Sequence, residues 1–190
     1  MPSFNALIEL YDKFYRWKDK TDNKFNKDLG CEIRARMKKC NWLLLRINEL
    51  EEESDKYYQM YVKMMHGGPK PDKSIIERDN EISDEMELMT ECFYFMAFRL
   101  LKALKSITEF KNLKSDGITI IRNKLLEHPE DKDSQIWINS FAHHGPKGPV
   151  LKAVRYNYQK DIFPDKGLYF NASELIDNIS KIINLKYKGA

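Results

Sequence analysis

The feature that most constrains the fold is an unbroken apolar repeat in the middle of the chain. It advances by steps of four and three residues through Ile82, Met86, Met89, Phe93, Met96, Leu100, Leu104 and Ile107. This spacing places every member on one face of an α-helix, so the segment predicts a long amphipathic helix. Because such a surface suits antiparallel packing against another long helix, we expect a bundle with this face in its core.

Two helices are expected before this repeat. The first carries apolar residues at helical spacing from Phe4 to Phe14 and fades in the polar stretch at 18–28. The second begins near Gly30 and ends at residues 66–71, whose glycines and prolines cannot continue a helix.

The sequence also indicates where the later helices begin and end. Ser74 is followed three residues later by Glu77, which is the spacing of a capping box, so the repeat helix is expected to start there. It is expected to end at residues 114–117, which contain an Asp-Gly pair. A last helix is expected to start at residues 171–174, with isoleucines and a leucine facing inward.

The pattern changes after Pro129. Two apolar runs, at 136–138 and 150–154, flank a stretch rich in glycine and proline. They predict a β-hairpin or an ordered loop over 136–165, before the last helix. The expected fold is therefore mainly α, a helical bundle with long antiparallel helices, a short helix before Pro129 and a small β-hairpin after it, in one domain spanning 1–190.

Composition excludes some classes of protein. The chain has 190 residues, 42% of them hydrophobic, and no apolar run approaches the roughly 20 residues needed to cross a bilayer. Residues 1–5 lack the basic patch and apolar stretch of a secretory signal. Cys31, Cys40 and Cys92 are odd in number and lie in apolar patterns, so we expect reduced core thiols and a cytoplasmic protein.

The net charge of +3 conceals two opposite runs. Residues 13–39 hold ten basic residues against four acidic ones, whereas residues 49–91 hold five against thirteen. A basic stripe could follow a nucleic-acid backbone. Alternatively, both runs are solvated faces of long helices that pair with each other, and the charge pattern leaves the choice open.

A short amphipathic segment at 118–129 carries the candidate chemistry. Arg122 and Asn123 stand near its start, and His128 directly precedes Pro129. Arginine can hold a phosphate through two hydrogen bonds, and histidine can move protons near neutral pH. The apolar face that we expect to pack inward consists of Ile118, Ile121 and Leu125.

Other familiar sites find no support. The sequence has no phosphate-binding glycine loop, no paired-cysteine zinc pattern and no glycine-flanked nucleophilic serine. His143 and His144 could bind a metal, but adjacent histidines usually point in different directions and no carboxylate lies at metal-ligand spacing from them. We therefore expect neither a metal nor a cofactor.

The 118–129 segment resembles the signature of the HEPN family, the higher-eukaryote and prokaryote nucleotide-binding domains. Those helical bundles carry an arginine, four to six intervening residues and a histidine, often with a polar residue such as asparagine after the arginine. The resemblance implies a metal-independent endoribonuclease in which a ribose 2′-hydroxyl attacks its own phosphate, in a toxin or defence role. It implies that His128 transfers the proton, Arg122 clamps the phosphate and Asn123 orients a neighbouring group.

One helix cannot easily aim both Arg122 and His128 at one phosphate, because six residues turn through about 600°. Either the helix ends before His128, since a residue before proline is pushed from helical angles, or two chains share their motifs. The second arrangement is a two-fold homodimer, as in HEPN ribonucleases. The expected partners are therefore RNA or a nucleotide and a second copy of the chain, with no membrane.

Two alternatives to catalysis remain open. A noncatalytic HEPN-like module would bind RNA or a nucleotide, or would regulate another protein. In an unrelated helical protein, His128 would only interact with the helix C-terminus, worth about 0.3–1 kcal/mol. Tyr156 and Tyr158 could stack on single-stranded RNA, or they could pack the hairpin onto the bundle.

Overall fold

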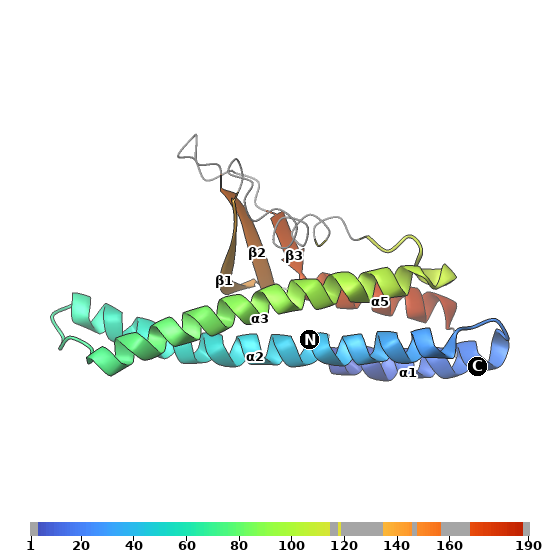
Figure 1. Ribbon diagram of the computed structural model, residues 1–190, viewed down its shortest axis with the longest axis horizontal. Helices are drawn as coiled ribbons and strands as arrows, with labels where there is room; N and C mark the ends of the chain where they lie inside the picture. The colour runs from blue at the N-terminus through green and yellow to red at the C-terminus, as the bar shows by residue number, and fades with distance from the viewer. Residues whose placement is uncertain (1–3, 115–117, 119–134, 146–147, 157–167, 188–190) are drawn as a thin grey trace.

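The computed structural model describes residues 4–114, 118, 135–145, 148–156 and 168–187. Its elements in chain order are α1 (Phe4–Thr21), α2 (Lys27–Met65), α3 (Lys73–Lys105), the 3-10 helix η1 (Thr108–Phe110), β1 (Gln135–Gly145), β2 (Gly148–Tyr156), β3 (Leu168–Asn171) and α5 (Ala172–Lys186). The described chain is mainly helical, as the sequence predicted. α2 and α3 run side by side along the length of the molecule, and α1 and α5 lie at the end where α2 begins (Figure 1).

Two ion pairs show how α2 and α3 are aligned. Arg46 on α2 lies 2.7 Å from Glu85 on α3, and Glu53 lies 3.0 Å from Arg78. Glu53 lies seven residues after Arg46 on α2, whereas Arg78 lies seven residues before Glu85 on α3. The two helices are therefore antiparallel. Partly exposed pairs of this kind contribute only about 0–1 kcal/mol each, so they favour one register more than they stabilise the fold.

The later part of the apolar repeat of α3 lies in the main core, where α1, α2 and α5 also contribute buried side chains, whereas Ile82 and Met86 form a second buried cluster with Leu50. Phe93, Leu100 and Leu104 are fully buried, as expected from the sequence. Met96 is only half-buried and packs against the edge of the core. Ile121, the remaining residue predicted for the core, lies outside the described residues.

The helix boundaries differ from three of the expectations. α2 begins before Gly30, because the side chain of Asn26 accepts a hydrogen bond from the backbone N–H of Leu29 at 3.1 Å. α3 is capped by Asp72, whose backbone carbonyl accepts the first helical hydrogen bonds, so the cap predicted at Ser74 is wrong. α3 also ends at Lys105, well before residues 114–117.

The early end of α3 follows from where the next apolar residues pack. Ile107 is extended, with φ −92° and ψ 131°, and it leads into the short helix η1. Phe110 and Leu113 are then buried in the same core as α3. A continued straight helix would carry these side chains past the start of α2, so turning back buries more apolar surface.

The strands form a three-stranded antiparallel sheet in the order β1-β2-β3. The two apolar runs expected to be extended, at 136–138 and 150–154, lie within β1 and β2. β3 was not expected from the sequence, because a run of four residues just before a helix carries little periodic signal. β1 contacts both α3 and α2, and from there the sheet projects away from the long helices (Figure 1).

The expectation of three core thiols is right for one cysteine only. Cys40 is buried, whereas Cys31 and Cys92 are exposed. Both exposed cysteines neighbour apolar residues in the sequence but fall on the opposite side of their helices from the buried face. Among the described helices, none is long and apolar enough to span a bilayer.

The buried side chains of Tyr11, Tyr94 and Cys40 should make the free energy of unfolding depend on pH. Burial is the largest cause that raises the pKa of Tyr11 and Tyr94, and it raises the pKa of Cys40 to about 12. The folded chain therefore keeps protons that the unfolded chain releases in alkali. The free energy of unfolding should fall between about pH 9 and about pH 11, by up to about 1.4 kcal/mol per pH unit for each group that is ionised only when unfolded.

Urea titrations at the two ends of this pH range measure the loss. Tyr11→Phe should make the decline shallower, because it removes one of the three protons. Tyr58→Phe, at a position that is 60% exposed, is the matched control. A free energy of unfolding that stays constant across this range would contradict the assignment.

Candidate functional site

The residues predicted from the sequence for catalysis, Arg122, Asn123 and His128, lie outside the described residues. Ile118, four residues before Arg122, is described and is 1% exposed. It belongs to the main core together with Leu113. The chain is therefore packed against the bundle just before the sequence motif begins.

His143 and His144 lie on β1, where they pair with Val150 and Pro149 of β2. The regular register of the two strands is interrupted between Asn139 and His143. Within the part of the chain that the structure describes, no three His, Cys, Asp or Glu side chains gather as metal ligands would.

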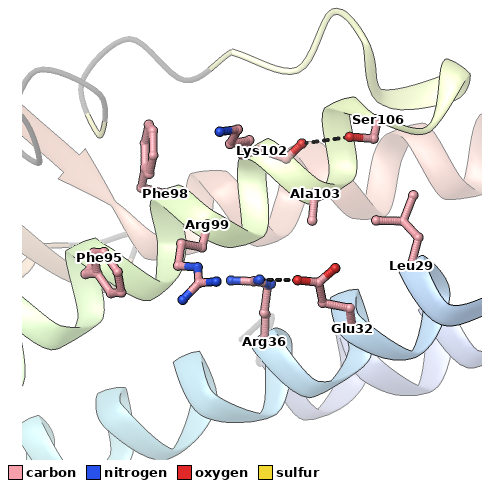
Figure 2. A pocket seen from close by; sticks show the side chains of 9 residues that line it. All are labelled: Leu29, Glu32, Arg36, Phe95, Phe98, Arg99, Lys102, Ala103 and Ser106. Atoms are coloured by element: carbon pink, nitrogen blue, oxygen red, sulfur yellow. Dashed lines mark hydrogen bonds and ion pairs between the residues drawn. The ribbon is translucent and has the colours of Figure 1, made fainter.

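A pocket of about 410 Å³ opens between the start of α2 and the end of α3. We call it the α2–α3 groove, and Figure 2 shows the side chains that line it. These side chains belong to Leu29, Glu32, Arg36, Phe95, Phe98, Arg99, Lys102, Ala103 and Ser106. Three residues come from α2, five come from α3, and Ser106 is the C-cap of α3. The groove therefore exists only because the two helices pack in this register.

Arg36 forms the α2 side of the groove, and its side chain is only 12% exposed. Its Nη2 donates to Oε1 of Glu32, which lies one turn earlier on the same helix. The Nε of Arg36 is buried and has no hydrogen-bond partner among the described residues. A buried donor without an acceptor costs about 1–3 kcal/mol, so an acceptor that reached this nitrogen would be bound favourably.

Arg99 forms the α3 side. Its guanidinium carbon lies 5.5 Å from the centroid of the Phe95 ring, within the range of a cation–π interaction. Figure 2 shows the side chains of Arg36 and Arg99 pointing toward one another. The pKa of Glu32 is lowered by the hydrogen bond and charge of Arg36 and, to a smaller extent, by the charge of Arg99. The positive charges of both guanidinium groups are therefore felt at the Glu32 carboxylate.

Cations outnumber anions in this groove. Arg36, Arg99 and Lys102 line it, against the single carboxylate of Glu32. Positive groups held close together repel one another, and an anion between them removes that repulsion. Because a guanidinium presents several donors in one plane, phosphate and carboxylate groups fit it well. The arrangement can therefore bind an anion, and two half-buried phenylalanine rings lie beside it.

The groove was not found from the sequence, although part of the signal was present. Phe95, Arg99 and Lys102 recur at steps of four and three residues on the face of α3 opposite its buried residues. Such a stripe indicates an aromatic and basic helix surface. Arg36 lies in the basic run at 13–39, but only the packing of α2 against α3 shows that it meets Arg99.

Comparison of the chain with protein-family models, with curated proteins and with solved structures finds no match.

Proposed function

We propose that the protein is a metal-independent endoribonuclease of the HEPN type, acting on RNA in the cytoplasm in a toxin or defence role. The motif of Arg122, Asn123 and His128 is the basis of this proposal. The observation that supports it most directly is the burial of Ile118, four residues before Arg122, in the core of the helical bundle. The sequence pattern alone would also be compatible with a free segment.

The proposed reaction needs only the groups of this chain and the RNA. His128 accepts the proton of a ribose 2′-hydroxyl, and the 2′-oxygen forms a bond to the adjacent phosphorus. The bond from phosphorus to the 5′-oxygen breaks, and that oxygen receives the proton that His128 took from the 2′-hydroxyl. Arg122 stabilises the negative charge that develops on the phosphate, and Asn123 holds a reacting group by a hydrogen bond. The products carry a 2′,3′-cyclic phosphate and a 5′-hydroxyl.

Cleavage of labelled single-stranded RNA by the purified protein in excess chelator tests the proposal. We expect products with a cyclic phosphate end, formed at the same rate with and without the chelator. A requirement for a divalent cation would overturn the mechanism, because the proposed groups include no metal ligand. An RNA that stays intact at every protein concentration would also overturn it.

We also propose a two-fold homodimer, because one motif helix cannot easily present Arg122 and His128 to one phosphate. In a symmetric dimer, Arg122 of one chain and His128 of the other can face the same cleft. Light scattering should therefore give about twice the 22.6 kDa mass of one chain. A mass that stays at 22.6 kDa over the concentrations that cleave RNA would exclude a site shared between chains.

A second candidate is a module that binds RNA or a nucleotide without cutting it. The α2–α3 groove favours this candidate, because its cations and aromatic rings suit a ligand and it contains no candidate proton-transfer histidine among its lining residues. Tight binding of intact RNA by the wild-type protein would support the binding module over the ribonuclease.

A further inference from the structure

We propose that the α2–α3 groove is a nucleotide-binding site, in which Arg36 and Arg99 hold a phosphate and a neighbouring base stacks on a phenylalanine ring. The ligand is one nucleotide unit, either within single-stranded RNA or as a free nucleotide. The choice of RNA as the first ligand to test rests on the proposed function. The binding chemistry itself rests only on the described residues of the groove.

The phosphate position follows from the two arginines. Arg36 has a buried Nε without a partner among the described residues, and it lies opposite the exposed Arg99. Lys102 is exposed one turn further along α3 and adds a third cation. A phosphate has enough acceptor oxygens to receive hydrogen bonds from both guanidinium groups at once. It would also relieve the repulsion between them.

Glu32 regulates access to Arg36. Its side chain is 49% exposed and is paired with the guanidinium of Arg36. Because the carboxylate can turn into solvent, an incoming phosphate can take its place on the guanidinium. The phosphate of the ligand therefore replaces the Glu32 carboxylate on Arg36. Removing the negative charge of Glu32 should make this replacement easier.

The base position follows from the aromatic residues. Phe95 and Phe98 are half-buried and line the same groove on α3. A base stacked on such a ring gains affinity regardless of its identity, because every base has a π-face. The volume of about 410 Å³ falls within the usual range of small-molecule pockets, so it suits one nucleotide unit and excludes a duplex.

Binding is measured by fluorescence anisotropy with a short labelled single-stranded RNA at low, fixed salt concentration. The full chain carries His128→Ala, so that cleavage does not interfere. Arg99→Gln should weaken binding about tenfold or more, because it removes a charge-assisted contact to phosphate. Arg16→Gln, at an exposed arginine of α1 outside the groove, makes the same change in net charge and should have a much smaller effect.

Two further variants test the details. Phe98→Leu should weaken binding several-fold, because it removes a stacking surface while preserving an apolar side chain. Glu32→Gln should tighten binding, because the phosphate no longer competes with a carboxylate for Arg36. Circular dichroism verifies that each variant is folded.

Competition identifies the form of the ligand. Displacement of the RNA by adenosine monophosphate at micromolar concentrations would assign the groove to free nucleotides, and displacement only by unlabelled RNA would assign it to a nucleotide unit in a strand. If Arg99→Gln and Arg16→Gln weaken RNA binding equally, the proposed site is wrong. It is also wrong if inorganic phosphate displaces the RNA as effectively as the nucleotide does. Weaker binding by Glu32→Gln would rule out the exchange of anions.

These binding experiments test the groove independently of the proposed ribonuclease activity. If the wild-type protein binds RNA through Arg99 but leaves it intact, the groove stands and the ribonuclease fails. If RNA is cleaved and Arg99→Gln behaves like Arg16→Gln, the ribonuclease stands and the groove fails.

Discussion

Replacing His128 with alanine should lower the rate of RNA cleavage by about 10²–10⁴-fold, because a positioned proton-transfer group is lost. The substitution keeps the backbone and removes only the imidazole. RNA binding should change much less than the cleavage rate, because the proposed clamp on the phosphate is Arg122. Single-turnover cleavage with enzyme in excess over labelled RNA separates the chemical step from binding.

His66 provides the matched control for this variant. It is an exposed histidine at the C-terminal cap of α2, far along the chain from the motif. His66→Ala removes the same imidazole and should cleave RNA at the wild-type rate. If His128→Ala cleaves as fast as His66→Ala, histidine acid–base catalysis at this position is excluded.

Arg122→Lys tests the second member of the motif. A lysine keeps the positive charge but presents it as a point, so it cannot reproduce two parallel hydrogen bonds to phosphate. The variant should therefore bind RNA and cleave it far more slowly than the wild type. Full activity in Arg122→Lys would show that only the charge matters at this position.

Much of the helical architecture could be predicted from the sequence because the apolar residues recur at the three- and four-residue spacing of one helix face. The repeat from Ile82 to Leu104 stays in phase with the helix for several turns, and its members are buried except for Met89 and Met96, which are half-buried. The boundaries were harder to predict. The cap of α2 depends on one side-chain hydrogen bond of Asn26, whereas Asp72 starts α3 with its backbone carbonyl and makes no side-chain cap bond, so neighbouring polar residues such as Ser74 look equally suitable in the sequence.

The groove could not be predicted because it depends on tertiary packing. Arg36 and Arg99 come from different helices, and their meeting depends on the register set by pairs such as Arg46 with Glu85. A shift of one helical turn would move Arg36 away from Arg99 and leave the hydrophobic patterns of both helices nearly unchanged. Sequence periodicity therefore identifies each helix face, whereas the site requires knowledge of which residues oppose one another.

Truncating Leu100 to alanine should lower the free energy of unfolding by about 2–5 kcal/mol. Leu100 is fully buried near the centre of the core formed by α1, α2, α3 and α5. The substitution removes apolar contacts and leaves a cavity that close-packed neighbours fill only in part. For a chain of this length, each kcal/mol lowers Tm by about 2–4 °C, so thermal unfolding followed by circular dichroism should show the loss clearly.

Leu88→Ala is the control, because it makes the same chemical change on the same helix at a residue that is 54% exposed. Its free energy of unfolding should stay within about 0.5 kcal/mol of the wild type. The contrast tests the orientation of α3, since a helix rotated by half a turn would exchange the two results. If Leu88→Ala were the more destabilising variant, the face assigned to the core would be wrong, and Arg99 would no longer face Arg36.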